Sequence, residues 1–327
     1  MAISFLTTLI ITPRFIRFLY AAGIVGLDLH KKNKPKLPAS GGICVASGVL
    51  AGLLSYIGIQ TFVYGIQAIS VYLLGVISSV LIVTFVGLLD DLNVKSKITR
   101  TKKDIRIGIP QWIKPLITLP AAIPLMVLNA GVTTMSVPFV GEINFGILYP
   151  LILIPIGVVG ASNMVNMLGG FNGSEAGMGI VYLLGLGLYA LFIGNIANVI
   201  FLISVASLLA FIKYNWYPAK ILPGDSLTYL LGSIVATGVI VGNMEKIGVI
   251  IMIPFFIEFL LKMRSRFKAK STGKLKANGT IESLYGRSIY SLTHIVMNLG
   301  KLTEKQIVII LIFIQVFFAV LPFFKPF

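Results

Sequence analysis

The chain has 327 residues, of which 57% are hydrophobic and only 12% are charged, with a formal net charge of +16. Soluble globular domains have roughly 45–50% apolar and 25% charged residues. This composition and a mean hydropathy of +0.95 exclude the soluble class and predict an integral membrane protein. The single cysteine, Cys44, excludes an internal disulfide, and the sequence holds no Cys/His cluster of the kind that binds zinc.

About ten apolar windows follow one another along the chain, each close to the ~20 residues that a membrane-spanning helix needs. They are centred near residues 11, 51, 78, 121, 155, 183, 205, 235, 254 and 313. The first begins "MAISFLTTLIITPRFIRF", without the basic segment and cleavage site of a signal peptide, so it is predicted to remain as a span. The sequence therefore predicts an all-α polytopic membrane protein of about ten transmembrane helices, with residues 1–327 in a single domain.

Lysines and arginines concentrate in every second connection between these windows. The basic connections are "HKKNKPK", "DDLNVKSKITRTKKDIRIGIPQWIK", "KYNWYPAK" and "KMRSRFKAKSTGKLK", whereas those near residues 62, 138, 194 and 244 hold almost no Lys or Arg. By the positive-inside rule, the basic connections face the cytosol and both termini lie outside. The positive charge thus reflects orientation and attraction to anionic lipids or phosphorylated substrates, and it does not indicate nucleic-acid binding.

Three of the few acidic residues lie where a predicted span meets the cytosol. "FVGLLDD" ends the third window with Asp90 and Asp91, and "ILPGDSL" opens the eighth with Asp225. Ionisable groups at membrane depth are costly and indicate a functional site. Asp225 could instead be a helix N-cap, a position that aspartate favours.

The fifth window ends in "NMVNMLGGFNGSEAGMG" on the same predicted face. Asn163 and Asn166 are spaced i, i+3 and so share one face of the helix, with about 4.5 Å of rise between them. Gly169 and Gly170 then let the backbone leave the helix. Amides and carboxylates together predict a cytosol-facing polar cup for a hard cation such as Mg²⁺ holding a phosphate.

Two other interpretations of these residues remain open. Asn163 could hydrogen-bond a neighbouring helix. An ion-coupled transporter could also use an Asp/Asn cup, although transporter sites lie near the bilayer midplane and these acids gather at one membrane edge.

"GLLDDL", "NMVNMLGGFNGSEAG" and "NWYPAKILPGDSLTYLLG", in this order, resemble the motifs of polyprenyl-phosphate N-acetylhexosamine-1-phosphate transferases. The similarity is closer to eukaryotic and archaeal GlcNAc-1-phosphate transferases than to the bacterial peptidoglycan translocase. It implies transfer of GlcNAc-1-phosphate from UDP-GlcNAc to a polyprenyl (dolichyl) phosphate, with release of UMP. The product would start lipid-linked oligosaccharide assembly for N-glycosylation. The alternative is the same chemistry with another UDP-N-acetylhexosamine for a cell-envelope glycan.

The resemblance further implies a multi-pass enzyme of the cell membrane, or of the ER membrane in a eukaryote, with its active site facing the cytosol. Its partners would be UDP-GlcNAc, the lipid phosphate and membrane lipids, and a homodimer is an open expectation. Asn166 and Asp225 match the ligands of Mg²⁺, with Mn²⁺ as an alternative. Asp90 and Asp91 match a catalytic pair that acts on the lipid phosphate or tunes the metal site, and Asn163 matches an amide that supports the site or contacts phosphate.

The remaining site residues also follow from the resemblance. Lys114 in "QWIK" matches the lysine that contacts the diphosphate, with Lys97 as a rival. Asn172, Gly173 and Glu175 match the loop that recognises uridine.

Arg264 and Arg266 in "RSRF" resemble an Arg-His-Arg element that binds sugar and diphosphate, and Ser265 stands in place of its histidine. His30 and His294 do not fill that gap, and we expect solvated or topogenic roles for both. The acidic residue that the eukaryotic first loop carries near "KPKLPASGG" is replaced by Ala39 or Ser40. The last basic loop is expected to contain a short helix or a hairpin.

Overall fold

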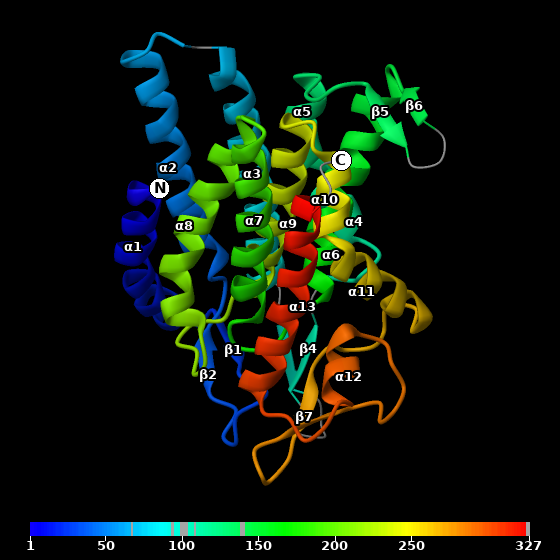
Figure 1. Cartoon of the computed structure of the whole chain (residues 1–327). Helices are drawn as coiled ribbons and strands as arrows, with labels where there is room; N and C mark the ends of the chain where they lie inside the picture. Colours follow the sequence, from blue (N-terminus) through cyan, green and yellow to red (C-terminus); the bar gives the residue numbers. More distant parts are fainter. Residues whose placement is uncertain (67, 93–94, 99–103, 108, 138–140, 325–327) are drawn as a thin grey trace.

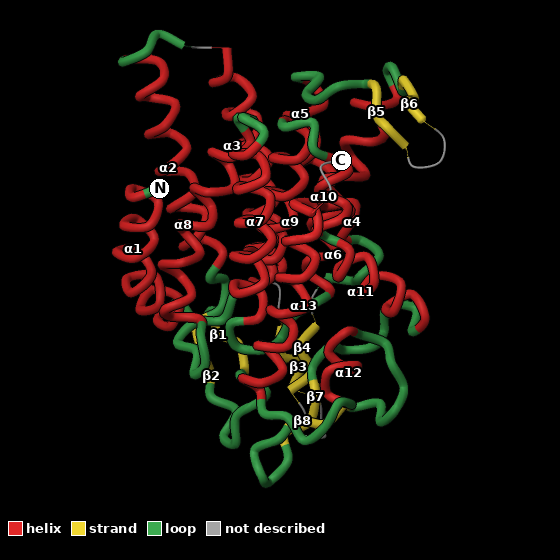
Figure 2. Tube along the Cα trace, in the orientation of Figure 1, coloured by secondary structure: helices red, strands yellow, loops and turns green. Residues whose placement is uncertain are grey.

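A bundle of long helices dominates the computed structural model, which describes residues 1–66, 68–92, 95–98, 104–107, 109–137 and 141–324 (Figures 1 and 2). Within these residues, eight helices are long and apolar enough to cross a membrane. They are α1 (Ala2–Ala21), α2 (Gly42–Phe62), α3 (Ala68–Leu92), α6 (Ile154–Met167) continuing η2 (Tyr149–Leu153), α7 (Ser174–Phe192), α8 (Ala197–Asn215), α9 (Gly224–Val241) and α13 (Glu304–Phe324). These helices coincide with eight of the ten predicted windows.

The other two windows form interrupted helices. The window near residue 121 is divided into α4 (Lys114–Thr118), η1 (Leu119–Ala122) and α5 (Ile123–Val127). The window near residue 254 is divided into α10 (Glu245–Ile251) and α11 (Ile253–Arg264). Prolines at the start of α4, η1, α5 and α11 explain the breaks, because proline lacks the N–H that continues a helical ladder.

Helix α9 lies at the centre of the bundle, with 83% of its span buried, compared with 22% for α1. Two glycines let neighbouring helices approach it closely. A Cβ atom on Gly87 of α3 would lie 2.5 Å from the Cα of Ser226, and one on Gly232 of α9 would lie 2.4 Å from the carbonyl oxygen of Ala161 in α6. Small residues permit such close backbone crossings between membrane helices, so the ends of α3, α6 and α9 are brought together.

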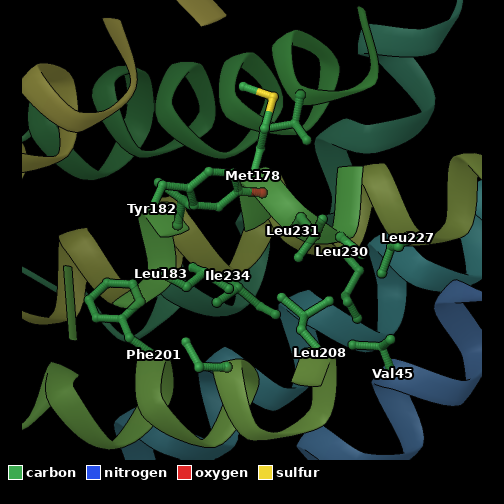
Figure 3. Close-up of a cluster of buried hydrophobic side chains, with 14 of the residues drawn as sticks. Val45, Met178, Tyr182, Leu183, Phe201, Leu208, Leu227, Leu230, Leu231 and Ile234 are labelled. Carbon is green, nitrogen blue, oxygen red and sulfur yellow. The ribbon is translucent and has the colours of Figure 1, made fainter. Parts of the chain in front are cut away.

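Two apolar clusters hold the helices in place. The larger one packs α2, α7, α8 and α9 (Figure 3), and its members include Val45, Met178, Tyr182, Leu183, Phe201, Leu208, Leu227, Leu230, Leu231 and Ile234. The smaller one packs η1 and α5 against α3, α6 and α9 through Val83, Leu125, Val158 and Ile240, among others. The second cluster places the preceding α4, with Lys114 at its start, beside the central helix.

Short antiparallel hairpins lie at the two ends of the bundle. One end, lower in Figure 1, carries β1 (Val25–Leu27) with β2 (Lys36–Pro38), β3 (Lys95–Ile98) with β4 (Asp104–Ile107), β7 (Gly273–Leu275) with β8 (Ile281–Ser283), and α12 (Leu292–Met297). The opposite end carries β5 (Thr134–Val137) with β6 (Gly141–Asn144). The lower end therefore holds the basic connections, which the sequence predicts to share one side of the membrane. The last of them contains both a hairpin and a short helix.

Candidate active site

Four helix ends meet at the lower end of the bundle and bring their side chains together. They are the last turns of α3 and α6 and the first turns of α4 and α9. Lys114 Nζ lies 2.7 Å from Asp90 Oδ2 and 2.7 Å from Asp225 Oδ2, so one ammonium bridges two carboxylates. Asp90 is 3% exposed and also accepts a hydrogen bond from the backbone N–H of Ile109 at 3.0 Å. The Asp225 side chain remains 29% exposed and is the open side of this cluster.

Asn166 connects the end of α6 to the start of α9. Its Nδ2 donates to Asp225 Oδ2 at 3.3 Å, and its Oδ1 accepts from the hydroxyl of Thr228 at 2.9 Å. Thr228 is a site residue that the sequence interpretation missed. Its signal was its spacing of i+3 from Asp225, which places both on one face of α9.

Asn163, one turn earlier on α6, points to α4 instead. Its Nδ2 donates to Thr118 Oγ1 at 3.1 Å and to the carbonyl oxygen of Val159 at 2.8 Å. The alternative interpretation, in which Asn163 hydrogen-bonds a neighbouring helix, therefore describes its contacts. The amide fastens α4, and through it Lys114, to the end of α6.

Asp91 turns away from its neighbour Asp90 and meets the N-terminus of α9. Its Oδ1 accepts from the backbone N–H of Asp225 at 2.8 Å, and its Oδ2 accepts from the backbone N–H of Ser226 at 3.3 Å. Ser40 Oγ also donates to Asp91 Oδ2, at 2.8 Å. The suggestion that Asp225 is the N-cap of its own helix is wrong, because the N-cap position is Pro223 and Asp225 lies within the first turn.

The loop between α6 and α7 is held by carboxylates. Gly170 N–H donates to Glu175 Oε1 at 2.7 Å, and Ser174 Oγ donates to Glu175 Oε2 at 2.6 Å, so this buried side chain organises its own loop. Gly173 has φ +85°, and a Cβ there would lie 2.6 Å from the ring of Trp216. The described contacts of Glu175 are thus internal to the protein, and uridine recognition by this loop stays a prediction.

Asn172 joins this loop to a second polar cluster that the sequence interpretation missed. Its Nδ2 donates to Asp28 Oδ2 at 2.9 Å, and its backbone N–H donates to Glu304 Oε1 at 2.8 Å. Lys31 forms ion pairs with both of these acids. The rarity of acidic residues in this chain was the available signal for Asp28 and Glu304.

The expectation that His30 and His294 are solvated is wrong, whereas a topogenic role for them stays a prediction. His30 is 3% exposed, stacks on Phe171 with ring centroids 4.4 Å apart, and accepts from the Gly273 N–H. His294 is fully buried and is held by the Tyr290 N–H and the carbonyl oxygen of Lys270. Their loops fold back on one another, and burial lowers the pKa of His30 to about 4 and also lowers the pKa of His294.

Arg264 is the last residue of α11, Arg266 follows the C-cap Ser265, and both arginines are exposed. Ser265 between them makes a turn, because its hydroxyl donates to the carbonyl oxygen of Lys262 and accepts from the Ala269 N–H. In the part of the chain that the structure describes, no ion pair connects either arginine to the Asp90–Lys114–Asp225 cluster. The rival lysine, Lys97, lies in β3, whose side chains fall outside the described part of the chain.

The donor atoms at the start of α9 fit a hard divalent cation. No group of three His, Cys, Asp or Glu side chains forms a metal site among the described residues, so protein ligands would come from a carboxylate and an amide. Asn166 Oδ1 uses one lone pair on Thr228 and keeps another, and Asp225 is partly open. The carboxylates of Asp90 and Asp225 bring two negative charges to the single positive charge of Lys114, and this excess suits Mg²⁺ that is also bound to phosphate oxygens.

Comparison with known proteins identifies the family of this chain. Residues 73–243, which include Asp90, Lys114, Asn166 and Asp225, match the model of glycosyl transferase family 4. A protein of Saccharolobus solfataricus is 38% identical over 322 residues, covering 98% of this chain and 93% of that protein. A protein of Sulfolobus acidocaldarius is 35% identical over 323 residues with the same coverage, and one of Dictyostelium discoideum is 25% identical over 351 residues, covering 90% and 79%.

All three relatives carry the name UDP-N-acetylglucosamine–dolichyl-phosphate N-acetylglucosaminephosphotransferase, which is a provisional assignment for the two archaeal proteins. Both archaeal proteins are more than 30% identical along nearly their full length, and the family model covers half of this chain. The chain therefore belongs to glycosyl transferase family 4.

Proposed function

We propose that this protein transfers GlcNAc-1-phosphate from UDP-GlcNAc to a polyprenyl phosphate such as dolichyl phosphate. The observation that carries the proposal is the meeting of Asp90, Lys114, Asn166 and Asp225 at one end of an apolar bundle. A water-soluble nucleotide can reach this end from solvent, while a lipid phosphate can reach it from the membrane surface. The names of the relatives support the same donor and the same class of acceptor.

In the proposed reaction, an oxygen of the lipid phosphate attacks the phosphorus that carries GlcNAc. The bond between this phosphorus and the bridging oxygen breaks, and UMP leaves with the electron pair. Phosphoryl transfer of this kind depends mainly on positioning and on neutralisation of negative charge. The product is a lipid-linked GlcNAc diphosphate, which fits the first step of lipid-linked oligosaccharide assembly for N-glycosylation.

Each residue of the cluster has a defined task in this proposal. Asp225 and Asn166 would hold Mg²⁺, or Mn²⁺ in its place, and the bound ion would neutralise the diphosphate. Lys114 would supply a fixed positive charge beside the diphosphate oxygens of UDP-GlcNAc, and Asp90 holds its ammonium group in place. Asn163 supports Lys114 through α4. Arg264 and Arg266 provide exposed guanidinium groups for sugar or diphosphate oxygens.

The site end of the bundle would face the cytosol, with both termini outside, in the cell membrane. Charge distribution supports this orientation, because the basic connections lie at the site end. The chain would act as a single domain, and assembly into a homodimer stays a hypothesis.

The test uses the purified full chain in detergent with UDP-GlcNAc labelled in the sugar, dolichyl phosphate and Mg²⁺. We expect lipid-soluble label and an equal amount of UMP, both abolished by EDTA and restored by Mg²⁺ or Mn²⁺. Undecaprenyl phosphate and other UDP-N-acetylhexosamines, assayed in parallel, measure acceptor and donor selectivity. If the well-folded protein forms lipid-linked product only from another UDP-N-acetylhexosamine, the proposed donor is wrong and that nucleotide sugar takes its place. If it forms no lipid-linked product from any donor, the proposal is overturned.

A further inference from the structure

We propose that Asp91 is a positioning residue that, together with Ser40, caps α9 and thereby fixes the carboxylate of Asp225, without touching substrate. The link to Asp225 as a metal ligand rests on the proposed function. The cap itself stands on the geometry of α3, α9 and the segment after β2.

The direction of the Asp91 side chain is the first observation. Adjacent residues on a helix point about 100° apart, and Asp90 and Asp91 at the end of α3 accept hydrogen bonds from different donors. Asp90 faces Lys114 at 2.7 Å. Both oxygens of Asp91 are occupied by donors from elsewhere in the protein, at distances of 2.8, 2.8 and 3.3 Å.

The N–H groups at the start of α9 find their acceptor in another helix. The first N–H groups of any helix lack partners within the helix and need an acceptor when they are buried. The N-cap residue, Pro223, provides no side-chain hydrogen bond. The carboxylate of Asp91, which arrives from α3, takes the role that an N-cap side chain usually performs, and its negative charge is favourable at a helix N-terminus.

Gly224 supplies independent evidence for a close fit. Its φ is +70°, and a Cβ there would lie 2.4 Å from Asp91 Oδ2 and 2.8 Å from the backbone nitrogen of Ser40. The carboxylate and the Ser40 backbone therefore occupy the space that a side chain at position 224 would need. Ser40 lies at the end of the segment after β2, which is itself joined to the α8–α9 loop by the bonds Leu222 N–H to Pro38 O and Gly41 N–H to Leu222 O.

The consequence concerns Asp225 directly, because its own backbone N–H is the shortest amide donor to Asp91. Holding that N–H fixes the backbone from which the Asp225 carboxylate extends toward Lys114 and Asn166. Ser40, in the first loop, thus contributes a hydroxyl that orients Asp91.

The experiment compares Asp91→Asn, Asp91→Ala and Ser40→Ala with the wild type, and uses Asp90→Asn as the matched control. Hydrogen exchange of the peptide that starts α9 reports the cap without any assay of activity. The Mg²⁺ concentration for half-maximal transfer reports the position of Asp225. The pH profile of kcat reports whether Asp91 exchanges a proton during the reaction.

Asparagine keeps one acceptor oxygen for the Asp225 N–H, and its NH2 group can donate to the Ser40 hydroxyl. Asp91→Asn should therefore change the exchange rate and the Mg²⁺ requirement much less than Asp91→Ala does, and it should leave the pH profile as in the wild type. Asp91→Ala should speed exchange at the start of α9 and raise the Mg²⁺ requirement, each by about tenfold. Ser40→Ala should show a smaller change in the same direction. Asp90→Asn should lose kcat while exchange at α9 stays unchanged.

The proposal is overturned if Asp91→Asn is as inactive as Asp91→Ala while exchange at α9 and the Mg²⁺ requirement stay at wild-type values, since that pattern indicates contact with substrate. If Asp91→Ala does not fold, Asp91→Asn and Ser40→Ala give the same decision. Absence of transferase activity in the wild type would reject the proposed function, whereas unchanged exchange in both Asp91 variants would reject the cap.

Discussion

Asp225 Oδ2 is shared between the ammonium of Lys114 at 2.7 Å and the amide of Asn166 at 3.3 Å. A single carboxylate therefore organises a cation and an amide from two other elements. This arrangement makes the residue the hub of the cluster, and its partly exposed carboxylate is the group that we propose as a ligand for an incoming cation. The two amides of α6 have different partners, because Asn166 contacts Asp225 whereas Asn163 contacts Thr118. Their contributions can therefore be separated by substitution.

Replacing Asp225 with alanine should reduce kcat/KM by about 10³-fold, because loss of a metal ligand removes several kcal/mol of charge stabilisation. The rate of lipid-linked product formation is the measurement, with thermal unfolding as the check that the variant is folded. Thr228→Val is a matched comparison. It removes only the hydroxyl that orients Asn166, and a loss of about tenfold or less is expected. Near-wild-type activity in folded Asp225→Ala would contradict the assignment.

Asn163→Ala should reduce kcat/KM less than Asn166→Ala does, because Asn163 acts on Lys114 only through Thr118. A double-mutant cycle with Thr118→Val tests this directly. Since the two side chains form one hydrogen bond, the effects of Asn163→Ala and Thr118→Val should not add. Additive losses, or a larger loss for Asn163→Ala than for Asn166→Ala, would place Asn163 in contact with phosphate.

Among the elements, the connections at the site end bind one another as well as the helices. The first connection supplies Asp28 and His30, the α6–α7 loop supplies Phe171 and Asn172, and the start of α13 supplies Glu304. Hydrogen bonds and stacking between these segments hold the loop that opens α7. The stability of one connection therefore depends on the others.

His30 gives this interlocking a measurable pH dependence. Burial lowers its pKa from the ordinary 6.5 to about 4, so below about pH 6.5 the unfolded state binds a proton that the folded state does not. Stability therefore falls between pH 6.5 and about pH 4. From pH 7 to pH 5, the melting temperature of the wild type should drop more than that of His30→Gln, by on the order of a few degrees.

Thermal unfolding in detergent at both pH values is the measurement. The neighbouring charges on Asp28, Lys31 and Glu304 are present in both proteins, so the difference between the two drops isolates His30. Equal drops would show that His30 is not a buried neutral side chain.

Gly173 and Gly279 provide a matched pair for the loop that opens α7. Both have positive φ, at +85° and +81°, but a Cβ at Gly173 would meet the Trp216 ring at 2.6 Å, whereas one at Gly279 would meet nothing within 4 Å. Gly279→Ala should lower the free energy of unfolding only by the backbone strain, about 1 kcal/mol. Gly173→Ala should lower it by about 1–3 kcal/mol more, because the new methyl group overlaps the ring. Comparable melting temperatures for the two variants would contradict this packing.

At the scale of the whole molecule, α1 runs toward the site end and α13 runs away from it, so the start of α1 and the end of α13 both lie away from the site (Figure 1). Lys276 and Glu142 are exposed in connections at opposite ends of the bundle. Cys44 is the single cysteine of the chain and is fully buried. Its replacement by alanine gives a cysteine-free background in which single cysteines can be labelled. With a membrane-impermeant maleimide, Glu142→Cys should be labelled from outside and Lys276→Cys only after permeabilisation. Labelling of both from outside would reverse the orientation.

Local sequence patterns predicted most of the membrane architecture. Hydrophobic length defines a span within about 20 residues, and eight of the ten windows are single helices. The prolines that interrupt the other two are visible in the sequence, but their effect depends on whether neighbouring helices can satisfy the freed backbone groups. The short motifs around Asp90, Asn166 and Asp225 were also recognisable, because each lies at the end of one helix.

The pairings among these motifs were decided by the tertiary structure. Asp91 and the Asp225 N–H are 134 positions apart, and Lys114 and Asp225 are 111 apart, so no local pattern could assign Asp91 to the cap and Asp90 to the ammonium. Burial of His30 likewise requires a stacking partner, Phe171, from a distant loop. Hydropathy and charge act along the chain and were determined by the sequence itself. Side-chain partners were determined by which helix ends and loops meet in the folded chain, as they do where α3 and α6 cross close to α9.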